Sequence, residues 1–313
     1  MAAGARLLTG IPSIWFVPAF TALILALLIF ASYENMTRVL KWLTLALFSY
    51  VFAAMLSGAD WLQVAWGTLI PRITFSRDYL LTFVAIMGTT ISPYLFFWQA
   101  AQNAEQDALI MRRIVGRPRR AVQRELRAAA RDVNAGMLFS NLIMYFIILT
   151  AGATLHRAGI TNVQTAEEAA RALKPVAGSA ASLLFTVGLV GTGMLGIPVL
   201  AGSAAYAIAE AAAWRAGMDE KVHSARQFYG VIAFAMIVGM LLNFLHVNAI
   251  KLLIGSAVIN GLLAPPLIAI VLVVCNNEQV MGVHRNRKTL NILGGLGVLL
   301  MSAAAVALIF SWL

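Results

Sequence analysis

Eight long runs of apolar residues, separated by short polar stretches, make up most of the sequence. They lie at about 12–32, 38–57, 79–100, 134–155, 182–213, 228–246, 249–275 and 290–312. A helix of about 20 apolar residues crosses the roughly 30 Å hydrocarbon core of a bilayer, and each run comes close to or exceeds that length. The pattern therefore predicts an all-α, polytopic membrane protein with eight spans.

Composition excludes most other classes of protein. Of the 313 residues, 61% are hydrophobic and 12% are charged, about half of the roughly 25% found in a soluble domain. A soluble fold cannot hide that much apolar surface, so an ordinary cytosolic enzyme, a disordered chain and a coiled coil are excluded. The single cysteine, Cys275, excludes an intrachain disulfide framework and a thiolate metal cluster.

The positive charges indicate the orientation of the chain. Most of the 23 Lys and Arg residues lie in four alternate loops, and segment 101–133 carries Arg112, Arg113, Arg117, Arg119, Arg120, Arg124, Arg127 and Arg131. Lys and Arg accumulate in cytoplasmic loops, so both termini are expected outside, as in a chain whose first spans are missing. We interpret 101–133 as a plain cytoplasmic connector. A nucleic-acid or lipid-headgroup patch is the alternative, less favoured because the segment lacks interleaved aromatic residues.

Pro93 lies in the middle of the third run and predicts a broken helix there. Proline has no N–H, and its ring collides with the carbonyl four residues back, which belongs to Thr89. In hydrocarbon a freed carbonyl must find a partner, and broken helices at mid-membrane are common ion and substrate sites of transporters. The alternative is a simple proline kink packed against neighbouring helices.

The other polar groups near the middle of the runs are hydroxyls and amides, among them Asn141 and Thr192, and no Asp or Glu lies there. Asn260-Gly261, followed by Pro265-Pro266, predicts a second interrupted helix that carries an amide at depth. Hydrogen bonding between helices is the alternative role for these groups.

Four segments together resemble a known family. They are GTTISPYLFFWQAAQ (88–102), GMLFSN (136–141), GTGMLGIPVLAGSAAYAIAE (191–210) and AVINGLLAPP (257–266). With them the chain is similar to a divergent bacterial branch of the NRAMP family of divalent-metal transporters.

The resemblance implies the LeuT-like inverted repeat, in which two sets of five spans are followed by an eleventh. Residues 1–78 would then be the remainder of the first repeat, 79–275 the second repeat, and 276–313 a cytoplasmic loop and the last span. The first three family spans, which supply an Asp and an Asn to the metal, would be absent.

The resemblance also implies candidate metal ligands. Thr89 stands where the family has an Ala carbonyl, Ser92 where it has a Met thioether, and Asn260 near a polar residue that faces the ion. Tyr94 stands at the histidine of the family's Met-Pro-His motif, and Gln99 lies near a second histidine. Replacing sulfur by a hydroxyl favours hard ions such as Mg²⁺ and Mn²⁺ over Cd²⁺. Without those histidines, weak or absent proton coupling is expected.

The expected function is secondary transport of divalent metal cations of the Mn/Mg/Fe class across the bacterial inner membrane. The metal is the substrate, no cofactor or nucleic acid is expected, and the sequence has no motif of an enzyme such as HExxH, a Walker loop or GxSxG. Tyr94, Gln99, Asn141 and Thr192 are further pathway candidates. Two alternatives stay open: a truncated, non-transporting protein that packs with a partner, and a LeuT-like carrier for an organic solute. The oligomeric state is left open.

Overall fold

The computed structural model describes residues 1–30, 33–70, 76–90, 96–104, 119–156, 159, 163, 165–218, 220–245 and 247–311. Regular structure within these residues is helical throughout, with no strand, as the apolar runs predict. The helices form two compact units, Met1–Leu69 with Phe97–Asn248, and Ile70–Phe96 with Ala249–Leu313. Each unit is described by itself.

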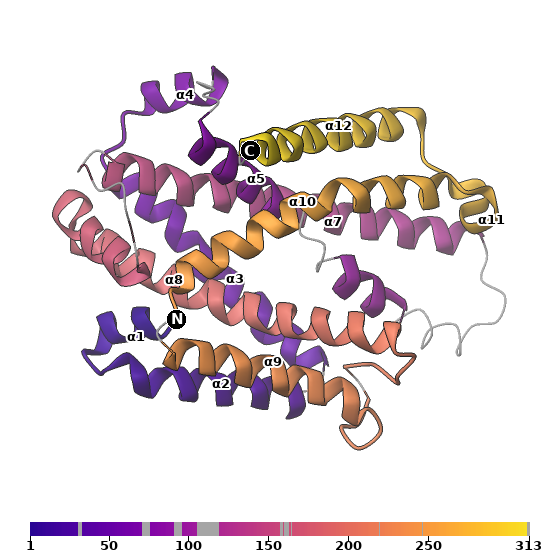
Figure 1. The fold of residues 1–313 in the computed structure, drawn as a ribbon, viewed down its shortest axis with the longest axis horizontal. Helices are drawn as coiled ribbons and strands as arrows, with labels where there is room; N and C mark the ends of the chain where they lie inside the picture. Colours follow the sequence, from indigo (N-terminus) through magenta and orange to yellow (C-terminus); the bar gives the residue numbers. More distant parts are fainter. Residues whose placement is uncertain are drawn as a thin grey trace. The chain divides into compact units, whose positions relative to one another are not determined.

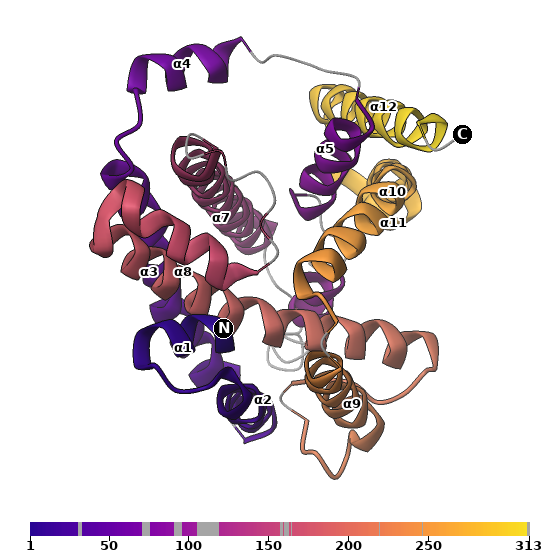
Figure 2. The ribbon, with the colours of Figure 1, turned by 60° about the vertical axis from the view of Figure 1, so that its left-hand side comes forward.

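A long helix, α8, runs through the first unit and contacts helices from distant parts of the sequence (Figures 1 and 2). The helices of this unit are α1 (Ala2–Thr9), α2 (Ser13–Phe30), α3 (Tyr33–Leu56), α4 (Trp61–Leu69), one over 96–104, α7 (Arg119–Ala151), α8 (Ala166–Ala211) and α9 (Arg226–Phe244). A π-helical turn, Gly152–His156, continues α7. α8 packs against α1, α2, α3 and α9, and is therefore the central element of the unit.

Small residues on α8 allow its neighbours to approach closely. Ala201, Ala205 and Ala209 recur every four residues and are buried, which places them on one face of the helix. The buried rings of Tyr206 on α8 and Phe228 on α9 lie 4.8 Å apart between centroids. Small residues on one helix and aromatic rings between helices are typical of packing inside a membrane, where tight van der Waals contact holds the spans together.

The second unit consists mainly of three helices that all contact one another. They are α5 (Arg77–Thr90), α10 (Ala249–Asn276) and α12 (Lys288–Phe310), and the short α11 (Glu278–Met281) and a 3-10 turn, Gly282–His284, join the last two. Val84, Val258 and Leu308, one from each main helix, are buried together in its core.

Seven helices in the described part of the chain are long and apolar enough to cross a membrane. They cover Ser13–Phe30, Arg38–Leu56, Arg127–Leu155, Leu183–Ala211, Arg226–Phe244, Ala249–Asn276 and Lys288–Phe310, and they match seven of the eight predicted spans. The remaining prediction, 79–100, corresponds to α5 and the helix over 96–104, with residues 91–95 outside the described residues. The division into repeats at 78 and 275 stays a prediction.

The predicted interruption of the Asn260–Pro266 segment is wrong. α10 is one continuous α-helix of 28 residues, with Pro265 and Pro266 inside it. Two prolines remove the N–H partners of only two carbonyls, those of Gly261 and Leu262. Ala264 and Pro265 are buried in the unit, and α5 and α12 pack along the helix, so its neighbours hold α10 together through the proline pair.

Candidate functional site

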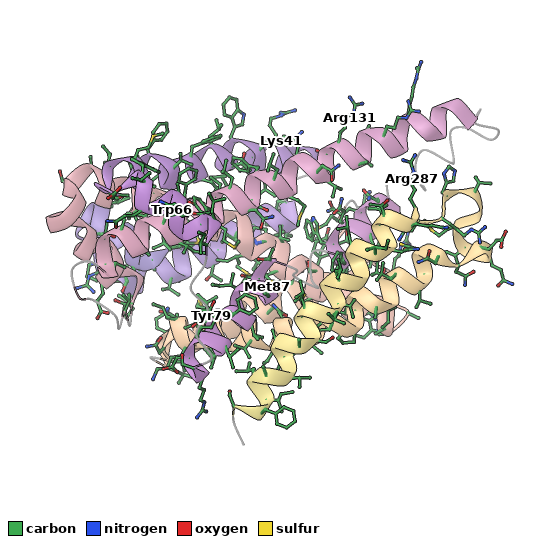
Figure 3. All side chains as sticks on the ribbon, turned by 90° about the horizontal axis from the view of Figure 1, so that it is seen from above. Lys41, Trp66, Tyr79, Met87, Arg131 and Arg287 are labelled. Carbon is green, nitrogen blue, oxygen red and sulfur yellow. The ribbon has the colours of Figure 1, made fainter. Side chains whose placement is uncertain are left out.

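Two glycines bring α5 and α10 into backbone contact. A Cβ on Gly88 would overlap the Ala257 carbonyl and the Gly261 nitrogen, and a Cβ on Gly261 would overlap the Val84 carbonyl. Both glycines are buried, and α5 ends two residues after Gly88. The C-terminal end of α5 is therefore fixed against the middle of α10 (Figure 3, where Tyr79 and Met87 mark α5).

The crossing places two of the predicted site residues on touching segments. Thr89 directly follows Gly88 and is exposed, and Asn260 directly precedes Gly261 and is half-buried. The hydroxyls of Thr89 and Thr90 both donate to the Ile86 carbonyl, at 2.8 Å each. Since each hydroxyl uses its proton in that bond, its oxygen can serve any further partner only as an acceptor or a metal ligand.

The electrostatics of this crossing favour a cation. The C-terminal end of a helix carries the equivalent of about half a negative charge, which stabilises nearby positive charge. Among the described residues no group of three or more His, Cys, Asp or Glu side chains could hold a metal. The donors at the crossing are hydroxyl, amide and carbonyl oxygens, and these suit hard cations rather than soft ones.

Three predicted residues of the break, Ser92, Pro93 and Tyr94, lie outside the described residues. α5 covers Arg77–Thr90, and residues 96–104 are helical, so described helical residues lie on either side of the segment in which the break is predicted.

The other pathway candidates belong to the first unit. Gln99 lies exposed on the helix over 96–104. Asn141 donates from its side-chain amide to the Met137 carbonyl, at 2.8 Å. The Thr192 hydroxyl lies 2.8 Å from the Gly188 carbonyl and 3.5 Å from the Tyr50 hydroxyl. Asn141 and Thr192 thus form hydrogen bonds to their own helices, as in ordinary helix packing.

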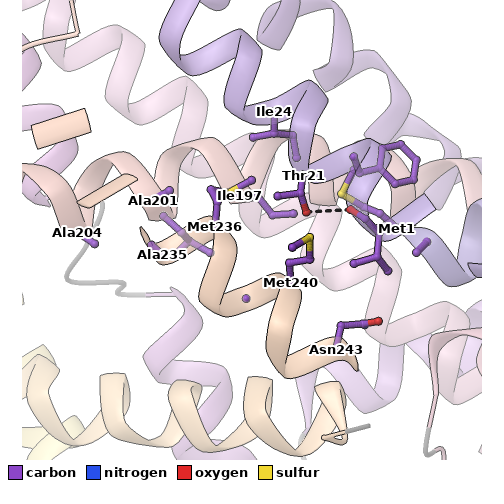
Figure 4. Close-up of a pocket in the computed structure, with 15 residues that line it drawn as sticks. Met1, Thr21, Ile24, Ile197, Ala201, Ala204, Ala235, Met236, Met240 and Asn243 are labelled. Atoms are coloured by element: carbon purple, nitrogen blue, oxygen red, sulfur yellow. Dashed lines mark hydrogen bonds between the residues drawn. The ribbon is translucent and has the colours of Figure 1, made fainter. Parts of the chain in front are cut away.

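A cavity of about 410 Å³ in the first unit was not predicted from the sequence. It lies among α1, α2, α8 and α9, and Met236, Met240 and Asn243 of α9 line it together with Thr21 of α2 (Figure 4). The Thr21 hydroxyl donates to the Val17 carbonyl at 2.8 Å. Methionine, alanine and glycine are unremarkable within apolar spans, so no sequence signal marks these residues as a lining.

A buried tyrosine pair fixes the loop between α8 and α9 and also escaped the sequence analysis. The Tyr206 hydroxyl accepts from the Met218 N–H at 3.1 Å. The Tyr229 hydroxyl lies 3.1 Å from the Met218 carbonyl and 3.0 Å from the Glu220 carbonyl, and these two acceptors share its single proton. Arg215 pairs with Glu220 at 3.0 Å on the surface of the same loop. Tyrosines at span ends are common enough that their spacing alone does not indicate this contact.

Comparison with known sequences decides the family. The sequence profile of Nramp, described as natural resistance-associated macrophage protein-like, matches residues 1–311. The chain belongs to the Nramp family. It is therefore a member of a family of multi-pass transporters with the LeuT-like fold, and its bacterial relatives and apolar helices place it in a bacterial inner membrane.

Several relatives of this chain are named divalent metal cation transporter MntH. The relative from Yersinia pestis is 24% identical over 273 residues, which are 85% of this chain and 59% of the relative. The one from Clostridium acetobutylicum is 22% identical over 247 residues, 79% of this chain and 53% of the relative. The one from Caldanaerobacter subterraneus is 25% identical over 147 residues, 46% of this chain and 32% of the relative. This chain thus spans about half the length of the curated relatives that it matches.

Proposed function

We propose that this Nramp chain forms the metal-handling spans of a secondary transporter of divalent cations of the Mn/Mg/Fe class. Family membership over residues 1–311 and the names of the relatives support this function. The cation is the substrate, so no resident cofactor and no enzymatic step are part of the proposal. An organic-solute carrier and a non-transporting relative receive no support from the relatives' names.

The observation that carries the proposed site is the contact of Gly88 with α10. It fixes the negative end of α5 beside the segment that holds Asn260, within a unit of otherwise apolar helices. In the proposed site the Thr89 oxygens and the Asn260 amide oxygen face the cation, and Ser92 adds a hydroxyl. Pro93 has no N–H, and we expect it to interrupt the hydrogen bonding of the span there.

These donors need help from elsewhere to take a divalent cation out of water. Removing a divalent ion from water is very costly, and neutral oxygens offset that cost poorly without a carboxylate. No Asp or Glu lies near the middle of the spans. We therefore expect little saturable uptake by the 313 residues alone, and uptake when a segment that carries a carboxylate completes the site.

The test measures Mn²⁺ and Mg²⁺ uptake into liposomes by the 313-residue chain and by any longer product of its reading frame upstream of Met1. Asn260→Ala and Thr89→Val are compared with the control Asn141→Ala. The side-chain amide of Asn141 donates a hydrogen bond within its own helix. We expect saturable uptake by the longer product, with at least about tenfold losses in the two site variants, as for one lost charge-assisted contact, and little loss in the control. Absence of uptake in both products, or equal uptake in all variants, would contradict the function or the site respectively.

A further inference from the structure

The helix α7 is longer than a single crossing needs. It has 33 residues from Arg119 to Ala151, which at 1.5 Å per residue is about 50 Å. The hydrocarbon core takes about 20 residues. The apolar part of α7 is its C-terminal part. The first dozen or so residues of α7 therefore extend beyond the membrane as a rigid continuation of the span. The distribution of positive charge assigns this end to the cytoplasm.

Arginines lie along one side of this extension. Arg124, Arg127 and Arg131 are spaced three and four residues apart, which at 3.6 residues per turn places them within an arc of about 60°. The acidic residues of the extension, Glu125 and Asp132, fall more than about 100° from the middle of that arc. The extension therefore has one basic side, and we refer to Arg124, Arg127 and Arg131 as the arginine stripe.

The stripe is exposed, and no ion pair within the described part of the chain neutralises it. All three side chains are exposed, and Figure 3 shows Arg131 projecting outward from the α7 ribbon. The Nε of Arg131 donates to the Arg127 carbonyl at 3.3 Å, which uses one of the five guanidinium N–H groups. The ion pairs formed by described residues include none of these arginines. The remaining guanidinium N–H groups are therefore open to solvent and accessible to an anion.

We propose that the arginine stripe binds the anionic headgroups of phospholipids in the cytoplasmic leaflet. Guanidinium groups bind phosphate through paired hydrogen bonds, and basic clusters next to a span attract anionic lipids. The stripe continues directly from an apolar span, so its nearest anions are the headgroups. Residues 119–134 contain no aromatic side chain on which a nucleic-acid base could stack.

The position of each arginine along α7 predicts its share of the binding. Arg131 is nearest to the apolar part of the helix, and Arg124 lies about 10 Å further along the axis. Attraction to the anionic surface decays within a Debye length, about 8 Å at physiological ionic strength. The contribution should therefore fall in the order Arg131, Arg127, Arg124.

Native mass spectrometry of the purified full chain, titrated with phosphatidylglycerol and separately with phosphatidylcholine, tests the proposal. We expect phosphatidylglycerol to bind more tightly, and Arg131→Gln to weaken that binding about fivefold, as for one arginine near the surface. Arg124→Gln should have a smaller effect, and the triple Gln variant should remove most of the preference. The triple Lys variant keeps the charge and should retain most of it.

A matched control removes three positive charges from another loop assigned to the cytoplasm, with Arg285→Gln, Arg287→Gln and Lys288→Gln. This control should lose less of the preference for phosphatidylglycerol than the stripe variant, because Arg285 is already paired with Glu278 at 3.2 Å. Equal loss in the control and the stripe variant would overturn the proposal, because the effect would then be net charge. Unchanged binding in a folded triple Gln variant, or displacement of the lipid by inorganic phosphate at constant ionic strength, would also overturn it.

Discussion

Oxygen atoms of individual residues supply all the metal ligands proposed in this chain. Ser92 is the informative position, because the Nramp resemblance places a thioether there. Thioethers favour soft cations, and hydroxyls favour hard ones. The Ser92→Met variant should therefore raise Cd²⁺ uptake relative to Mg²⁺ in liposomes that carry a transporting form of the protein. An unchanged ratio of Cd²⁺ to Mg²⁺ would remove Ser92 from the proposed site.

Gly88 is the residue on which the helix crossing at the site depends. In Gly88→Ala the added Cβ overlaps the backbone of α10, which cannot give way as a flexible side chain can. We expect a loss of about 1–3 kcal/mol, typical of overpacking, measured as a lower midpoint of thermal unfolding in detergent.

The control for this prediction is Gly255→Ala on α10. A Cβ at Gly255 meets no atom within 4 Å, and alanine is the better helix former by about 1 kcal/mol. This variant should be neutral or stabilising. Equal destabilisation by both variants would show that the α5–α10 contact is not the cause.

At the scale of elements, the hydroxyls of the buried Tyr206 and Tyr229 hold the loop between α8 and α9. Tyr229→Phe leaves the Met218 and Glu220 carbonyls without the hydroxyl that donates to them. Loss of such bonds in a buried place costs about 1–3 kcal/mol, so the loop should open locally more often. We expect trypsin to cleave at Arg215 or Lys221 at least about fivefold faster in this variant. A loss of about 1.4 kcal/mol raises the population of the open loop tenfold.

Tyr79→Phe is the matched control, because the Tyr79 hydroxyl has no hydrogen-bond partner among the described residues, while its backbone N–H donates to Ser76 Oγ. Its cleavage rate at the loop should equal that of the unmodified chain. If Tyr229→Phe also leaves the rate unchanged, the tyrosine contacts do not limit the opening of the loop.

At the scale of the whole molecule, the side chains available in the spans predict weak proton coupling. Neither Gln99 nor Tyr94 has an ordinary pKa near neutrality, and the middle of the spans has no Asp or Glu. In liposomes with a transporting form of the protein, Mn²⁺ uptake should proceed with little acidification of the lumen, followed with an internal pH dye. Proton influx that tracks Mn²⁺ uptake would assign the coupling to residues outside these spans.

The sequence by itself determined the membrane class, seven of the spans and the Nramp resemblance. Span length and apolar composition are local properties, since about 20 apolar residues have few alternatives to a transmembrane helix. Pro93 and the Gly-Thr-Thr segment before it also indicated the region of the candidate site. The ends of the helices did not follow from the apolar pattern, because α7 and α8 extend well beyond their apolar parts.

Only the tertiary structure decided which segments meet. Pro265 and Pro266 predicted a break, yet α10 is continuous, because packing against α5 and α12 offsets the loss of two hydrogen bonds. Gly88 and Gly261 are separated by more than 170 residues, and no local pattern reveals that their backbones touch. The exposure of the arginine stripe likewise depends on what packs around α7. Such contacts are set by the complementary shapes of distant helices, a property that the periodicity of one segment does not contain.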